Sequence, residues 1–141
     1  MKESKEQRKI RQDREEQLFI SVLRDAGNRV DTEVMFDTRP EDKSQSPPIP
    51  RRWRIDVALP DCDLFARGRG RDGCYPTEDI AIEIQGIGWG HAKFSSRMND
   101  IEKNGELFAQ GWTALQVSRA MIADGTALDL LARRGVRVTR K

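Results

Sequence analysis

The chain has 141 residues, of which 34% are charged and 37% hydrophobic, and its formal net charge at pH 7 is +2. This length predicts a single domain, and the sequence has no run of about 18 apolar residues that could span a membrane. The charged N-terminus lacks the apolar segment of a secretory signal, and Cys62 and Cys74 do not have the spacing of a zinc site. We therefore expect a cytoplasmic protein with reduced cysteines, whose partners depend on where its basic residues lie.

The chain opens with a predicted long helix that ends at Gly27-Asn28. Residues 1–14 are a charged extension of this helix, either a solvated segment or an arm that contacts phosphates. Glu15 and Glu16 directly precede an apolar stripe, and either side chain could point toward the core. The stripe consists of Leu18, Phe19, Val22, Leu23 and Ala26.

Three strands are expected next, at 29–36, 52–59 and 80–85, because apolar and polar residues alternate in each of them. Residues 37–50 contain four prolines among serines and charged residues, which predicts a loop between the first two strands. Such alternation is typical of strands that bury one face, so the three segments are expected to share one sheet.

The second and third strands each carry an acid opposite an apolar face. Asp56 is expected on the face opposite Ile55 and Val57, and Glu83 lies with Gln85 opposite a row of isoleucines. Two carboxylates and an amide that meet at one point form a suitable ligand set for a hard divalent cation.

Two glycine-rich segments flank the third strand. The first is a basic insertion at 61–79, either a plain surface loop or a set of phosphate contacts, because flexible arginines contact phosphates without reading base sequence. The second segment, 86–93, lacks the Gly-Lys-Ser/Thr ending of a Walker motif, and its His91 is either a proton shuttle or a solvated residue. The arginines of the insertion are Arg67, Arg69 and Arg71.

The remaining pattern predicts a helix at 95–111, a strand at 112–118, a helix from a capping Thr126 to Gly135, and an edge strand at 136–138. The order of helix, three strands, helix and strand predicts an α/β fold with a mixed sheet, because a helical crossover favours a parallel return strand. The apolar positions of the second long helix are Met98, Ile101, Leu107 and Phe108.

With these motifs, the chain resembles the PD-(D/E)XK nuclease superfamily, and more closely the small phage and prophage endonucleases of the very-short-patch-repair and restriction-endonuclease-like groups. The matching segments are EEQLFISVLRDAG, RRWRIDVALP, IAIEIQGIGWGHAKF and DIEKNGELFAQGWTALQVSRAMIADGTALDLL, which cover most of residues 15–132. The resemblance implies a restriction-endonuclease-like αβββαβ core, with one nuclease domain at 15–141. Residues 1–14 and the 61–79 insertion lie outside the matching segments.

The resemblance also implies residue roles. Asp56 and Glu83 match the metal-binding acids of the superfamily, which would hold Mg²⁺ or Mn²⁺, and Glu16, or alternatively Glu15, matches the helical acid. Gln85 stands where the superfamily usually has lysine, and an amide cannot carry that charge. Some related nucleases recruit a lysine from the following helix, so Lys103 is the candidate substitute.

The implied activity is metal-dependent cleavage of DNA by an endonuclease of phage or mobile-element origin, working in the cytoplasm of a bacterium or a phage-infected cell. Arg67, Arg69, Arg71, His91 and Lys93 are the expected DNA contacts. A homodimer is an expectation from the resemblance, since many relatives cut two strands. The alternative is a nuclease-fold module for DNA binding or assembly that lost catalysis with the change to Gln85. A protein without nuclease function and with a solvated acidic strand face is the third class.

Overall fold

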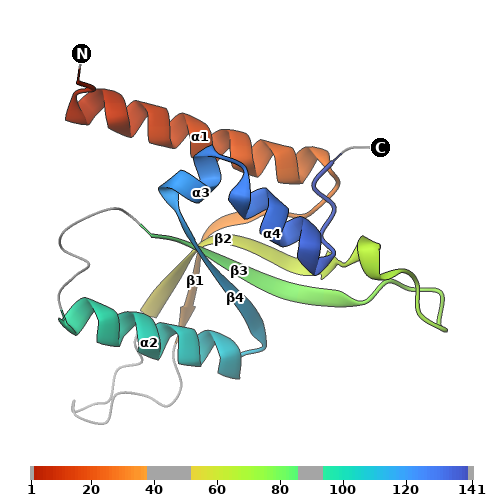
Figure 1. Ribbon diagram of the computed structural model, residues 1–141. Helices are drawn as coiled ribbons and strands as arrows, with labels where there is room; N and C mark the ends of the chain where they lie inside the picture. Colours follow the sequence, from red (N-terminus) through yellow and green to blue (C-terminus); the bar gives the residue numbers. More distant parts are fainter. Residues whose placement is uncertain (1, 38–51, 86–93, 140–141) are drawn as a thin grey trace, which may run out of the picture.

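A computed structural model of the chain describes residues 2–37, 52–85 and 94–139 (Figure 1). The candidate DNA contacts His91 and Lys93 lie outside the described residues. None of the helices in the described ranges is both long and apolar enough to cross a membrane. The elements are α1 (Lys5–Asp25), β1 (Asp31–Asp37), β2 (Arg52–Asp63), the 3-10 turn η1 (Phe65–Arg67), β3 (Thr77–Gln85), α2 (Phe94–Ala109), β4 (Trp112–Ser118), α3 (Arg119–Ala123) and α4 (Thr126–Arg134).

The fold is a mixed four-stranded sheet between two helical layers, which confirms the predicted α/β class. The strand order is β1-β2-β3-β4, with antiparallel pairing among the first three strands and parallel pairing between β3 and β4. Helices α1, α3 and α4 cover one face of the sheet, and α2 covers the other (Figure 1). The α2 crossover therefore joins two parallel strands, as expected from the order of the elements.

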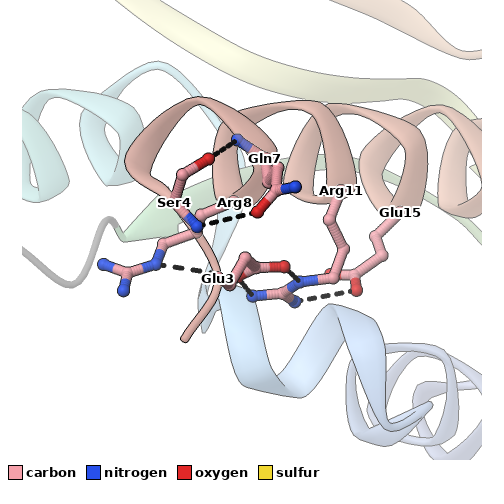
Figure 2. Close-up of polar contacts among 6 residues, drawn as sticks. All are labelled: Glu3, Ser4, Gln7, Arg8, Arg11 and Glu15. Atoms are coloured by element: carbon pink, nitrogen blue, oxygen red, sulfur yellow. Dashed lines mark hydrogen bonds and ion pairs between the residues drawn. The ribbon is translucent and has the colours of Figure 1, made fainter. Parts of the chain in front are cut away.

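Helix α1 is fixed at its start by a polar cap and at its end by the core. Ser4 and Gln7 form a capping box, which satisfies backbone N–H groups that the first turn leaves without partners (Figure 2). Phe19 and Leu23 are buried, but Leu18 is 64% exposed, so its predicted place in the core stripe is wrong. Each residue of an α-helix advances by about 100°, and Leu18 falls outside the arc that the buried residues occupy. The charged extension at 1–14 is helical from Lys5 onward.

Strand β3 alternates as predicted, whereas β2 does not. Ile82 packs on the α1 side of the sheet, and Ala81 belongs to the cluster under α2. In β2, Val57 joins the first cluster and Ile55 the second, so the prediction that these two share a face is wrong. The regular pleat is interrupted between Ile55 and Val57. Pairing of β2 with β3 runs from Val57↔Ile82 toward the hairpin, and on β1 Glu33 has φ of 53°.

Strand β2 also continues past Pro60, where the sequence predicted its end. The register with β3 shifts between Leu59 and Cys62, and Asp61 has φ of 47° with its N–H donated to Asp79 Oδ1 at 2.8 Å. Proline is tolerated at such a bulge because its missing N–H is not needed there for the ladder. Part of the predicted insertion is therefore an extension of the β2–β3 hairpin.

In the C-terminal half, the apolar positions of α2 differ in burial and the predicted cap of α4 is wrong. Ile101 and Phe108 of α2 are exposed while Leu107 is fully buried, because each lies about 100° or more around the helix from Leu107. Thr126 is the first helical residue of α4, and the capping position is Gly125.

The expected edge strand at Val136 and Val138 is absent from the described residues 135–139. The N–H of Val136 donates to the Leu131 carbonyl, and Asn28 Nδ2 donates to the Arg137 carbonyl at 2.7 Å. Hydrogen bonds thus tie this segment to α4 and to the end of α1. The segment packs onto the core through Val136, which is buried.

Candidate active site

The centre of the candidate site is a buried ion pair between the sheet and α2. Glu83 points from β3 toward α2 and is 5% exposed, and Lys103 Nζ lies 2.7 Å from its Oε2. Glu83 Oε1 is buried without a hydrogen-bond partner among the described atoms. Burial raises the pKa of Glu83 to about 7, although the Lys103 ammonium opposes this rise and the charge of Asp56 adds to it. Helix α2 therefore covers the face of the sheet that carries Glu83.

Asp56 lies where β2 and β3 separate. Its Oδ2 accepts the N–H of Ile84 at 2.9 Å, and its Oδ1 lies 3.4 Å from Arg54 Nη2. The carboxylate thereby satisfies a backbone donor of β3 where the regular ladder has stopped. Because Ile84 directly follows Glu83, this bond brings Asp56 near Glu83, the other acid that the sequence predicted as a metal ligand.

Glu16 and Glu15 point to different surroundings. Glu16 lines a cavity of about 290 Å³ together with Asp56 and Ile84, and burial raises its pKa. Glu15 instead pairs with Arg11 at 3.0 Å, and Arg11 also binds Glu3 (Figure 2). Of the two glutamates, Glu16 is therefore the one that shares a cavity with Asp56.

Gln85 is the last residue of β3 and is half-buried. Its Cα partner on the parallel strand β4 is Ser118. This register places Gln85 at the same end of the sheet as Glu83. Arg119, the residue that follows β4, lies at this end as well.

The arginines of the β2–β3 loop are not brought to the acids. The loop lies at the far end of the hairpin (Figure 1), and six residues of β3 separate Thr77 from Glu83, which is about 20 Å at 3.3 Å per residue. Arg69 covers the Tyr75 ring at 5.2 Å, and the N–H of Ala66 donates to the Gly135 carbonyl. The expected closeness of this loop to the acids is thus not found, and its contact with phosphates remains a prediction.

Two arginines at the cavity were not predicted as site residues. Arg54 stands two positions before Asp56, and this spacing within one strand was the available signal. Arg119 comes from the start of α3, and only the β3–β4 register reveals that this position lies near the acids.

The donor set fits a magnesium ion, which needs one or two carboxylates beside water and substrate oxygens. Asp56 and Glu83 supply these carboxylates, and Glu83 Oε1 is buried without a partner among the described atoms. No group of three or more His, Cys, Asp or Glu side chains able to hold a metal occurs among the residues that the structure describes. Searches against family models, curated proteins and solved structures each found no match, so the chemistry of these side chains carries the functional conclusion.

Proposed function

We propose that the chain is a metal-dependent DNA endonuclease built on a restriction-endonuclease-like core. The observation that carries this proposal is the meeting of Asp56 with the buried Glu83–Lys103 pair at the point where β2 and β3 separate. A buried ion pair of this kind is weak evidence for stability, since desolvation offsets much of its attraction. A buried acid with a raised pKa and a specific charged partner is instead typical of functional sites.

Asp56 and Glu83 would hold Mg²⁺ or Mn²⁺, with Glu16 across the cavity from Asp56. When bound, the ion supplies charge to polarise the scissile phosphate and to lower the pKa of a nearby water. Hydrolysis adds negative charge to the phosphate as water attacks phosphorus and one P–O ester bond breaks. The residues of the chain must therefore present fixed positive charge on the same side.

Lys103 is the proposed source of that charge, in place of the lysine that Gln85 replaces. Its ammonium group lies against Glu83 in the structure and is held there by α2, whose Leu107 is fully buried under the sheet. A preorganised cation in a water-poor site stabilises developing charge more strongly than one in bulk water. Lys103 would thus both orient Glu83 and stabilise the transition state.

The decisive experiment incubates the protein with linear, nicked and branched DNA in Mg²⁺, Mn²⁺ or EDTA. Cleavage should require the metal, and Asp56→Asn should abolish it while leaving DNA affinity roughly intact. Asp129→Asn is the matched control, because Asp129 is exposed on α4 and pairs with Arg133 one turn further along the helix.

Full activity in EDTA or in Asp56→Asn would contradict the assignment. Metal-independent binding of DNA without cleavage of any of the three substrates would favour the DNA-binding or assembly module instead. Sedimentation of the protein with and without DNA would test the expected homodimer.

A further inference from the structure

Arg119 is held in a fixed position at the end of the sheet that carries the acids. It follows Ser118, which pairs with Gln85 across the β3–β4 register. Ser118 also caps α3, accepting the N–H of Met121 at 3.2 Å and donating its own N–H to the Met121 sulfur. Helix α3 in turn contacts α1, so the backbone that carries Arg119 is fixed on two sides.

The guanidinium of Arg119 is incompletely satisfied. Its Nη1 is buried and has no hydrogen-bond partner among the described atoms, and the nearest acid, Glu16, places Oε1 3.8 Å away. That separation is too long for a hydrogen bond. Arg133, by contrast, lies 3.0 Å from Asp129 on the surface of α4. A buried donor without a partner is costly, which indicates that a further acceptor belongs beside Arg119.

The cavity beside Arg119 has the size for a compact anion, and its lining brings arginines and acids together. Its volume of about 290 Å³ holds several waters at about 30 Å³ each, and it is near the lower limit for sites of small organic ligands. Arg54 and Arg119 bring donors, and the acids of the lining are Glu16, Glu33 and Asp56. A divalent cation shared with the anion would offset the charge of these acids. Guanidinium groups bind phosphate oxygens through paired hydrogen bonds, and they keep their charge at every accessible pH.

We propose that Arg119 binds a backbone phosphate of DNA in the cavity between α1, α3 and the sheet, with the more exposed Arg54 as a second donor at the rim. This assignment rests on the proposed function and deepens it, because it names the residue that holds the nucleic acid against the acids. Arg119 acts as a phosphate-binding residue, separate from the loop arginines at the far end of the hairpin.

The test measures binding of a fluorescently labelled short DNA duplex in EDTA over a series of salt concentrations. Loss of one phosphate contact lowers the slope of log affinity against log salt by about 0.9. Arg119→Gln should show this loss, and the matched control Arg133→Gln should keep the slope of the native protein. In Mg²⁺, Arg119→Lys should retain the charge but raise KM, because lysine lacks the paired donors.

A second measurement uses the native protein, so it does not depend on whether a variant folds. In protein with ¹⁵N-labelled arginine, the Nε–H signal of Arg119 should shift when the duplex is added, and that of Arg133 should not. An unmoved Arg119 signal, or a native salt slope in folded Arg119→Gln, overturns the phosphate assignment. If the native protein still cleaves DNA, the nuclease proposal survives that result. If Arg119→Gln has the lowered salt slope but the native protein cleaves none of the DNA substrates, the phosphate site is supported and the nuclease proposal is contradicted.

Discussion

Replacing Glu83 with glutamine should change how the stability of the metal-free protein depends on pH. Glu83 is nearly inaccessible to solvent, and its pKa of about 7 lies well above the ordinary value of 4.5. The folded state therefore binds the proton more tightly than the unfolded state does. The contribution of Glu83 to the free energy of unfolding should be fully present below pH 4.5 and should fall as the pH rises from 4.5 to about 7. Above that pH the contribution should stay constant.

The size of the effect follows from the shift. A rise of the pKa from 4.5 to about 7 corresponds to about 3 kcal/mol at 1.36 kcal/mol per unit, and about 2 kcal/mol of this is lost between pH 5.5 and 8.5. Glu83→Gln removes the titration but leaves the Lys103 charge without its partner. That second cost is nearly independent of pH, so it changes the free energy of unfolding by the same amount at pH 5.5 and at pH 8.5. The difference between the values at these two pH values is therefore the readout.

Urea unfolding in EDTA at pH 5.5 and pH 8.5 measures this difference. Relative to the native protein, Glu83→Gln should gain about 2 kcal/mol as the pH rises across this range. Asp129→Asn, an exposed acid on α4, reports the effect of simply removing one negative charge. The raised pKa would be refuted if the difference in free energy of unfolding between Glu83→Gln and the native protein were the same at both pH values. A variant that loses stability relative to the native protein as the pH rises would refute it as well.

Lys103→Ala should lower the cleavage rate at least about a hundredfold with folding intact, and Gln85→Lys in that background should recover part of it. A normal rate in Lys103→Ala would leave the metal and Gln85 as the whole machinery. At pH 8.5, Mg²⁺ should raise the melting temperature of the native protein but not that of Asp56→Asn, because ligands that bind only the folded state stabilise it. Equal shifts in both would place the ion elsewhere. Replacing the three arginines of the β2–β3 loop with alanine should flatten the salt dependence of DNA binding by up to about three units, and an unchanged slope would show a solvated loop.

The sequence was sufficient to predict the four strands of the sheet, their order of appearance and the parallel return through α2, although it also predicted an edge strand at 136–138 that the described residues lack. It also placed Glu83 on the face opposite Ile80 and Ile82, because β3 keeps a regular pleat. The same argument failed in β2, where the pleat is interrupted beside Asp56 and the faces of Ile55 and Val57 diverge. Alternation reports faces only while pairing remains regular, and irregular pairing is common beside functional sites.

Helix faces and long-range neighbours were less predictable. An apolar residue such as Leu18 or Phe108 carries no sign in the sequence that it lies just outside the buried arc of its helix. Likewise, the closeness of Arg119 to Glu16 depends on the parallel register of β3 and β4 and on the packing of α3 against α1. Both properties arise from tertiary packing, which local patterns do not record.

The position of the loop arginines separates binding from chemistry in the proposed nuclease. About 20 Å of β3 lies between the hairpin loop and Glu83, and this corresponds to roughly six base pairs at 3.4 Å per base pair. A duplex that reaches both regions would contact the loop through phosphates well away from the scissile one. The loop would then contribute to affinity and its salt dependence, whereas Lys103 and Arg119 would act on the phosphates beside the acids. Changes in the loop should therefore raise KM with little effect on kcat, while changes at Lys103 should lower kcat.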